Sequence, residues 1–366
     1  MREHKAAVGK MLTWRKEKGK SSSMTQFLKA LAAAKRFWEY KRYPSARGVE
    51  VEITGACNAR CYYCQVGYDN LKQIRHEKKA YLSVDEFQRM IRFLKEHGFL
   101  TKGDRLVLNV WNEPCLHPEF SKIIKIGHQE GCLMSLNTNG SIRPRISDDF
   151  DAVSIGNVGF SMPGFSQASY DRIHQFDFER IKSNIEWIVK TFREHGCFGF
   201  FMLRFHVYRF NVHEIEPARK WAQSLGVCFQ PYYAYINDSL RMQQYLRGEL
   251  SGEYLANVSK DLFMDRHCAY SRREACCVCD FMSNVYIDVD GFVIHCCLDS
   301  TRMGCLTDFE SPEQLVKAHR NSRICKKCLA DLNHCVMRPS PVDGYVLEKQ
   351  RVTSKYLYQA LKTCFL

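Results

Sequence analysis

The chain has 366 residues, of which 45% are hydrophobic and 25% charged, as expected of a globular protein with one large domain or two moderate ones. No apolar run approaches membrane-spanning length, and no export signal is visible ahead of the 18 cysteines. We therefore expect a cytoplasmic protein whose thiols bind metals, rather than a transmembrane protein or a secreted disulfide scaffold.

The first predicted unit is a basic, partly helical segment over residues 1–48. It holds 13 Lys or Arg against 3 Glu, which accounts for most of the net charge of +13. Such a segment could meet an acidic partner, an anionic substrate or a membrane surface. The interpretation we favour is a solvated helix that packs on the core by its apolar residues. No nucleic-acid-binding module is recognisable, so no nucleic acid partner is predicted.

Three cysteines, Cys57, Cys61 and Cys64, follow directly on the first predicted strand. Thiolates are the usual protein ligands of iron–sulfur clusters, and three of them leave one iron of a four-iron cluster open to a substrate or cofactor. The alternatives are a zinc knuckle or buried packing thiols. Zinc ribbons favour paired C-x2-C units, and core cysteines rarely come three within eight residues, so the pattern favours a cluster.

From residue 50 to about 235, short apolar runs alternate with helical segments. The clearest helix opens at Ser83, where Glu86 completes a capping box, and closes at Gly98. Six β–α alternations predict a parallel sheet with its functional residues at the C-terminal ends of the strands. Strands are predicted at 51–54, 106–110, 133–137, 158–162, 198–207 and 227–232, and further helices at 177–196 and 211–226.

The spacing C-x3-C-x-φ-C, with Tyr63 as the aromatic residue φ, resembles the signature of the radical S-adenosylmethionine (SAM) enzymes. The resemblance implies an α/β fold with a partial (β/α)6 barrel. It also implies a 4Fe-4S cluster on the three cysteines, whose open iron is chelated by SAM, with Tyr63 near the SAM site. In this family an electron from the cluster cleaves SAM to a 5′-deoxyadenosyl radical, which abstracts hydrogen from a substrate C–H.

The residues N-E-P after the second predicted strand resemble the family's G-G-E-P motif. The resemblance makes Glu113 the acceptor of the SAM ammonium and Asn112 a further SAM contact, although Trp111 and Asn112 stand where the family has glycines. Cys115 is a candidate donor of a hydrogen atom to a substrate radical, with a packing role as the alternative. In the T-N-G sequence after the third strand, Asn139 is either another SAM contact or part of a tight turn.

After residue 236 the alternation stops and a cysteine-dense region runs to Cys335. It resembles the SPASM or twitch extension of radical SAM enzymes, in which a hairpin glycine precedes a cluster ligand. Gly291 and Cys296 fit that spacing. The resemblance implies one closed auxiliary 4Fe-4S cluster held by Cys279, Cys296, Cys325 and Cys328, with Cys277 as the alternative to Cys279.

Only Cys335 follows the C-x2-C pair closely, which favours one auxiliary cluster over two, and Cys335 stays an additional candidate ligand. Zinc is the competing occupant of four thiolates. We divide the chain into the basic segment 1–48, a radical SAM core 49–235, a linker with the auxiliary domain 236–345, and a helical tail 346–366.

The predicted function is the net oxidation of a small polar substrate, such as a sugar or aminocyclitol, with the auxiliary cluster as electron acceptor. A low-potential donor such as flavodoxin or ferredoxin would supply the first electron. Two alternatives stay open: crosslinking or epimerisation of a ribosomally made peptide, and a non-catalytic iron–sulfur or zinc scaffold. Substrate identity is beyond the sequence, since a fold does not imply a reaction.

Overall fold

The computed structural model describes residues 48–342 and 345, apart from 75–76, 102–103, 198, 274–278, 332 and 338. The basic segment up to residue 47, the predicted tail and Cys277 lie outside this part of the chain, so what was predicted for them stays a prediction.

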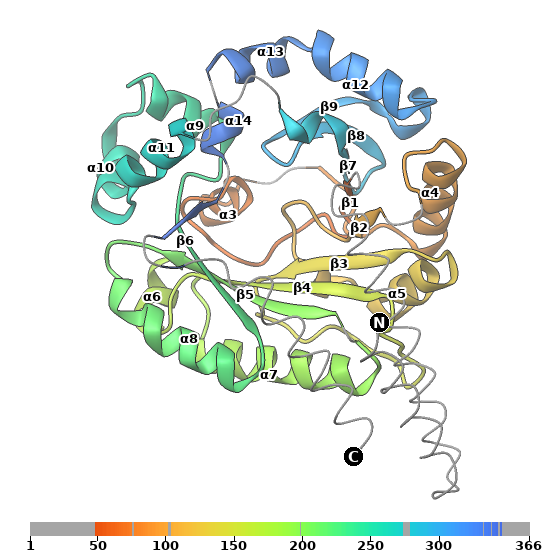
Figure 1. The fold of residues 1–366 in the computed structure, drawn as a ribbon, viewed down its shortest axis with the longest axis horizontal. Helices are drawn as coiled ribbons and strands as arrows, with labels where there is room; N and C mark the ends of the chain where they lie inside the picture. The colour runs from red at the N-terminus through yellow and green to blue at the C-terminus, as the bar shows by residue number, and fades with distance from the viewer. Residues whose placement is uncertain are drawn as a thin grey trace, which may run out of the picture.

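Ten strands of the described chain form one sheet in the order β10-β6-β5-β4-β3-β2-β1-β7-β8-β9 (Figure 1). The first six strands are parallel and lie in chain order. β1 and β6 do not pair with each other, because β7 takes the outer edge of β1 and β10 takes that of β6. This arrangement confirms the predicted α/β fold with an open six-stranded parallel core.

The strands are β1 (Gly48–Val51), β2 (Arg105–Val107), β3 (Leu133–Thr138), β4 (Ile155–Met162), β5 (Phe200–Val207), β6 (Cys228–Tyr233), β7 (Val285–Ile287), β8 (Phe292–Cys296), β9 (Asp299–Cys305) and β10 (Ser340–Pro341). The α-helices are α3 (Gln65–Leu71), α4 (Val84–Glu96), α5 (Phe120–Gln129), α6 (Gln167–Arg172), α7 (Phe178–Glu194), α8 (Ile215–Ser224), α9 (Ser239–Leu246), α10 (Gly252–Asp261), α11 (Met264–Arg273), α12 (Pro312–Asn321), α13 (Arg323–Ala330) and α14 (Asn333–Val336). Short 3-10 turns are η1 (Pro114–Leu116), η2 (Val212–Glu214), η3 (Asp280–Ser283) and η4 (Leu306–Asp308).

The predicted helices are confirmed together with their end signals. The Ser83 hydroxyl accepts from the backbone of Glu86 while the Glu86 carboxylate accepts from the backbone of Ser83, so the capping box of α4 is complete. At the start of α7 the Asp177 side chain accepts from the backbone N–H of Arg180. Gly98 and Gly196, which follow α4 and α7, have φ of 71° and 87°, a conformation that glycine adopts without strain.

The first two strands end before the predicted positions. β1 stops at Val51 and β2 at Val107, whereas the apolar runs continue to residues 54 and 110. Beyond these points side chains serve as hydrogen-bond acceptors for backbone N–H groups: the carboxylate of Glu52 accepts from the N–H groups of Trp111 and Asn112. The predicted strand 51–54 is therefore placed three residues too late in the sequence, and the predicted strand 106–110 is too long at its C-terminal end.

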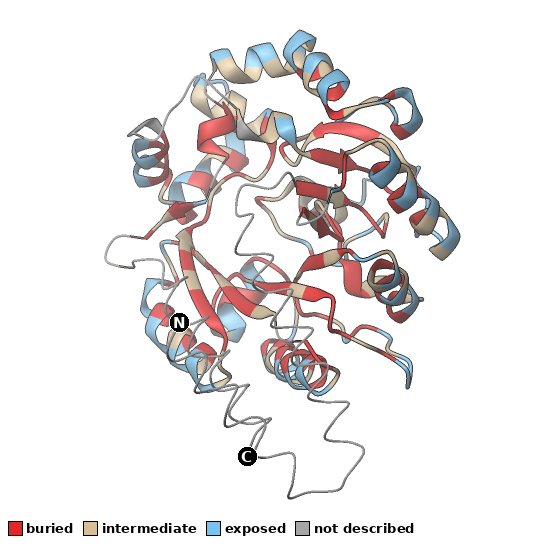
Figure 2. Cartoon of the chain, turned by 45° about the vertical axis from the view of Figure 1, so that its right-hand side comes forward, coloured by how far each residue is buried: buried red, intermediate tan, exposed pale blue. Residues whose placement is uncertain are grey.

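The two faces of the parallel core differ in chemistry. Residues on the face that packs against α4, α5, α7 and α8 are apolar and buried, and they form one continuous core (Figure 2). Each large aliphatic or aromatic side chain removed from water there contributes roughly 1.5–3 kcal/mol. The opposite face carries polar side chains on every one of the six strands, among them Glu50, Arg105, Asn137, Asn157, Arg204 and Tyr232.

The cysteine-rich region continues the core sheet. β7 pairs in parallel with β1, and β8 and β9 follow as an antiparallel hairpin. Gly291 in the turn between β7 and β8 has a φ of 89°, which fits the hairpin predicted at Asp290-Gly291. Helices α12 and α13 lie beside this hairpin, and α9, α10, α11 and α14 gather at the other end of the same side (Figure 1). Within the described residues, no helix is both long and apolar enough to cross a bilayer.

Ser83→Ala should destabilise the fold by about 1 kcal/mol, because it removes the side-chain acceptor that caps α4. The free energy of unfolding in urea measures this change. Ser259→Ala is the matched control: this serine is exposed in the middle of α10, where alanine is the better helix former. Equal stabilities for the two variants would show that the capping box does not contribute.

Candidate functional site

The three N-terminal cysteines lie on one loop between β1 and α3. Cys64 is the N-cap residue of α3, and the backbone N–H groups of Val66 and Gly67 point toward its sulfur. Cys57, Cys61 and Cys64 are partly buried and close enough to act electrostatically on one another. A helix N-terminus favours a thiolate, so the local fold suits a negatively charged metal ligand.

Helix α3 holds this loop from one side. The side-chain amide of Asn70 donates to the carbonyls of Cys57 and Ala59, at 2.7 and 2.8 Å. Gly67 lies against the backbone of Cys61, and a Cβ at this position would come within 2.5 Å of the Cys61 nitrogen. Glycine is therefore required here for a close approach of the helix to the loop.

Helix α10 holds the loop from another side. The Tyr63 hydroxyl donates to Asp261 at 2.8 Å, and Tyr62 stacks on Tyr254 with ring centroids 5.1 Å apart. Tyr63 is 4% exposed, and its polar end faces α10. The structure thus gives the Tyr63 hydroxyl an anchoring role, and the predicted contact with SAM would come from its ring or its backbone.

Burial raises the pKa of Cys57 to about 12, and it also raises the pKa of Cys61 and Cys64. Without a metal the three thiols are protonated at neutral pH. A metal centre has to displace these protons when it binds, as thiolate sites generally do. Among the described residues, no three Cys, His, Asp or Glu side chains converge on a single ion.

Glu113 lies beside the cysteine loop, at the position predicted from the N-E-P sequence. It is 2% exposed, and its backbone N–H donates to the carbonyl of Ala56. Its carboxylate accepts from the backbone N–H groups of Cys115 and Asn139 and from the Thr138 hydroxyl, at 2.7–3.0 Å. These three bonds leave about one acceptor position of a carboxylate for an ammonium group.

Asn139 connects this carboxylate to the first cysteine. Its side-chain amide lies 3.7 Å from the Cys57 sulfur and donates to Asn58 at 3.0 Å. The T-N-G sequence is therefore both a turn, with Gly140 at a φ of 71°, and a contact of the cysteine loop. The structure brings Cys57, Glu113 and Asn139 together from three different strand ends.

Trp111 and Asn112 stand where glycines were expected. Asn112 is buried and donates through its side chain to the carbonyl of Thr54. The indole N–H of Trp111 donates to the carbonyl of Cys297 at 2.9 Å, next to the predicted auxiliary ligand Cys296. The departure from the glycine pattern thus ties the N-terminal site to the C-terminal hairpin.

Sequence reasoning missed Glu52. Burial raises its pKa to about 7, although it accepts backbone N–H bonds from Trp111 and Asn112. Glu52, Cys57 and Trp111 line a cavity of about 1530 Å³, solvent-open space included, between α3 and the β8–β9 hairpin. The signal was present, because an acidic residue alternates with valines and an isoleucine in the run V-E-V-E-I, which is unusual for a buried strand.

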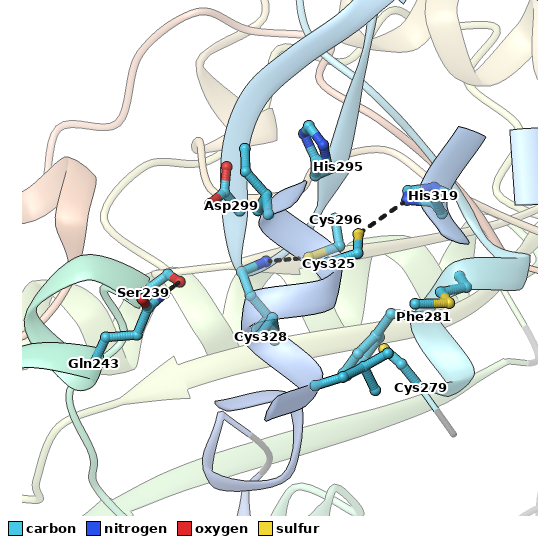
Figure 3. Close-up of a pocket in the computed structure, with 14 residues that line it drawn as sticks. Ser239, Gln243, Cys279, Phe281, His295, Cys296, Asp299, His319, Cys325 and Cys328 are labelled. Atoms are coloured by element: carbon cyan, nitrogen blue, oxygen red, sulfur yellow. Dashed lines mark hydrogen bonds between the residues drawn. The ribbon is translucent and has the colours of Figure 1, made fainter. Parts of the chain in front are cut away.

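The four cysteines predicted for the auxiliary centre line one pocket (Figure 3). Cys279 precedes η3, Cys296 ends β8, and Cys325 and Cys328 lie one turn apart on α13. The pocket holds about 460 Å³, solvent-open space included, and it is mostly apolar apart from these thiols, two histidines, Ser239, Gln243 and Asp299. A partly buried set of four soft donors fits either a closed cluster or zinc by ligand type.

Two histidines of this pocket were not predicted. His295 donates through Nδ1 to the carbonyl of Thr301 and bonds through Nε2 to the Ser322 hydroxyl, which caps α13. His319 Nδ1 lies 3.6 Å from the Cys325 sulfur, and burial lowers the pKa of His319 to about 4. Neutral histidines around metal thiolates orient the ligands and tune the centre.

The two other cysteines singled out from the sequence, Cys335 and Cys115, are buried thiols. Cys335 is buried, contacts His334 and does not line the four-cysteine pocket. Cys115 is 2% exposed, and burial raises its pKa well above the usual range. It packs within the core next to Glu113, as expected of the packing alternative.

Comparison with known proteins agrees with this arrangement. Residues 51–220 match the family model described as "Radical SAM superfamily". A "Probable GTP 3′,8-cyclase" of Methanococcus vannielii is 27% identical over 142 residues, which are 38% of this chain and 44% of that protein. The chain therefore spans less than half of this relative's length.

A second relative is a "Putative glycyl-radical enzyme activating enzyme" of Methanocaldococcus jannaschii, 25% identical over 225 residues, 59% of this chain and 81% of that protein. Among solved structures, SuiB of Streptococcus suis bound to the precursor peptide SuiA aligns with a TM-score of 0.50. That alignment covers 76% of this chain and 67% of SuiB at 11% identity, so it supports the fold alone.

Gly67→Ala should displace Cys61 and lower iron binding at the N-terminal site, because the added Cβ would overlap the Cys61 backbone. Iron and acid-labile sulfide per chain after anaerobic reconstitution measure the loss. Gly127→Ala is the matched control, since this helical glycine faces only the flexible side chain of Met134. Full iron loading of Gly67→Ala would contradict the requirement for close approach.

Proposed function

Because residues 51–220 form a radical SAM superfamily domain, we propose that this protein cleaves SAM reductively and uses the resulting radical to oxidise a small polar substrate. The observation that carries this proposal is the meeting of Cys57, Glu113 and Asn139 at the C-terminal ends of the parallel strands. This is the edge where parallel α/β folds place their active sites.

Each residue has a distinct role in the proposal. Cys57, Cys61 and Cys64 would hold a 4Fe-4S cluster, and the fourth acceptor position of the Glu113 carboxylate would receive the SAM ammonium. Asn139 and Asn112 would position the Cys57 loop against SAM. With SAM bound, the cluster supplies the one-electron reduction that yields a 5′-deoxyadenosyl radical.

The auxiliary centre completes the electron balance. Removal of one hydrogen atom leaves a substrate radical, and loss of one further electron and a proton makes the reaction a two-electron oxidation. Cys279, Cys296, Cys325 and Cys328 would hold the cluster that accepts this electron. The neutral His319 next to Cys325 supports this role, because hydrogen bonds to cluster sulfurs raise the affinity for an electron.

A peptide is the second candidate substrate. The cavity beside Cys57 and Trp111 has about 550 Å³ of space for water-sized molecules, which lies within the usual 300–1,000 Å³ of a small-molecule pocket, and it is open to solvent, so part of a peptide chain could also enter it. Flavodoxin or ferredoxin as electron donor and a cytoplasmic location remain predictions from the sequence.

Cys61→Ala should abolish formation of 5′-deoxyadenosine from SAM by reconstituted protein with a low-potential reductant, because the cluster loses one of its three ligands. Cys305→Ala changes an exposed thiol outside both sites and should keep the activity. Chromatographic quantification of 5′-deoxyadenosine measures the difference between the two variants. If wild-type protein with intact clusters leaves SAM uncleaved, the scaffold alternative is correct and the enzymatic proposal is wrong.

Cys325→Ala should still cleave SAM but lower product formation at least about tenfold, because the electron acceptor loses a ligand while the N-terminal site keeps all three. The measurement compares 5′-deoxyadenosine with oxidised product in the same reaction. Cys335→Ala, which changes a buried thiol outside the four-cysteine pocket, serves as the control. Unimpaired product formation by Cys325→Ala would remove the auxiliary centre from the reaction.

A further inference from the structure

We propose that the substrate carries a carboxylate or phosphate group and that Arg204 binds this group on the inner face of the open barrel. This inference rests on the proposed function and names the chemical class of its substrate. The observations behind it concern the polar face of the parallel sheet, opposite the face on which the helices pack.

The inner face is polar and partly accessible in the middle of its strands. Asn137, Arg204, His206, Gln230 and Tyr232 come from β3, β5 and β6. All five are only partly buried, whereas the neighbouring residues that face the helices are almost all buried. A mid-strand side chain of a parallel sheet is normally covered on both faces. The described residues therefore leave space on this side.

Arg204 is the cation in this space. Its guanidinium has five N–H donors, yet it makes no hydrogen bond or ion pair with any described side chain. Gly159 on β4 provides the room for it, because a Cβ there would come within 2.6 Å of Asn137 Oδ1 and 3.3 Å of Arg204 Nε. Arg204 thus reaches across Gly159 toward the amide of Asn137.

The charges around Arg204 leave a positive excess. Arg105 and Arg204 both act on the acidic residue Glu50, and burial still raises the pKa of Glu50 to about 7 despite these two cations. His206 adds no charge, since burial lowers its pKa to about 3 and it shares a 2.5 Å hydrogen bond with the Tyr232 hydroxyl. Two guanidinium groups therefore face a carboxyl that is only partly ionised at neutral pH, which favours an anion.

Two amide oxygens nearby indicate further contacts with a ligand. Asn137 Oδ1 and Asn157 Oδ1 are buried and have no hydrogen-bond donor among the described residues. Asn157 is 5% exposed, so an unfilled acceptor on it costs free energy in the unliganded protein. Hydroxyl or N–H groups of a polar substrate would satisfy both oxygens while its anionic group binds Arg204.

The position suits a substrate that meets the SAM site. Arg204 on β5 pairs with Gln230 on β6, and Cys64 forms a β-bridge with Asn237, four residues after the end of β6. The strands that carry Arg204 and Gln230 therefore lead directly to the N-terminal cysteine loop.

The carboxylate of SAM is the other anion that Arg204 could bind. The experiment separates binding of SAM from binding of the substrate. Arg204→Gln should leave SAM binding and substrate-free SAM cleavage unchanged, because Arg204 serves the substrate. Weaker SAM binding by this variant would assign Arg204 to SAM and overturn the proposal. If the wild-type protein does not cleave SAM, the proposed function fails, independently of this result.

The substrate arm uses extract of the source cell grown on a deuterated carbon source and separated on an anion exchanger at neutral pH. Deuterium in 5′-deoxyadenosine should come from the retained fraction. Arg204→Gln should lower this transfer about tenfold to a hundredfold, the value of a charge-assisted hydrogen bond, and Arg204→Lys should recover part of it. Arg219→Gln, which changes a partly exposed arginine paired with Glu216, is the control. Deuterium in 5′-deoxyadenosine that comes from the unretained fraction would overturn the proposal. Deuterium transfer by Arg204→Gln at the wild-type level would also overturn it.

A second measurement needs no substrate. Phenylglyoxal modifies accessible arginines, and peptide mass spectrometry reports the rate at each one. Inorganic pyrophosphate should slow modification of Arg204 in the full-length protein and leave the rate at Arg219 unchanged. Equal rates at Arg204 with and without pyrophosphate would show that no anion binds there and would overturn the proposal.

Discussion

The buried carboxylate of Glu113 is the contact on which the site depends. It joins three separate strand ends, because its backbone binds the loop after β1, its own segment follows β2, and its side chain accepts from Thr138 and Asn139 at the end of β3. A carboxylate at 2% exposure is costly to bury without hydrogen bonds, so its three donors and the strand ends that carry them hold one another in place. The irregular cysteine loop acquires a fixed position from this network and from α3 and α10.

The same segment connects the two cysteine sites. Trp111 bonds the hairpin next to Cys296, and the β1–β7 pairing makes that hairpin part of the core sheet. The separation of the two sites is consequently set by strand register and one indole hydrogen bond, rather than by a flexible linker. A reaction that passes an electron from a substrate to a second metal centre requires such a fixed separation.

Several residues singled out from the sequence also make structural contacts that no motif indicates. Glu113 lies next to Cys57 as the motif predicted, yet most of its acceptor capacity is used to hold the strand ends. Tyr63 was predicted from its place in the cysteine motif, and its hydroxyl is bound to Asp261, almost two hundred residues away in the sequence. Side-chain direction depends on such distant partners, which local spacing cannot reveal.

The sequence by itself determined the elements and the two thiol sets, because strand and helix periodicity, caps and cysteine spacing are local properties. The helix after Ser83, the loop with Cys57, Cys61 and Cys64, and the hairpin at Gly291 are of this kind. Only the tertiary structure decided that β7 extends the core sheet, that four distant cysteines share a pocket with His295 and His319, and that Arg204 faces unfilled amides. These features arise when strands far apart in the chain pair and turn alternate residues to one side, and no single segment encodes that register.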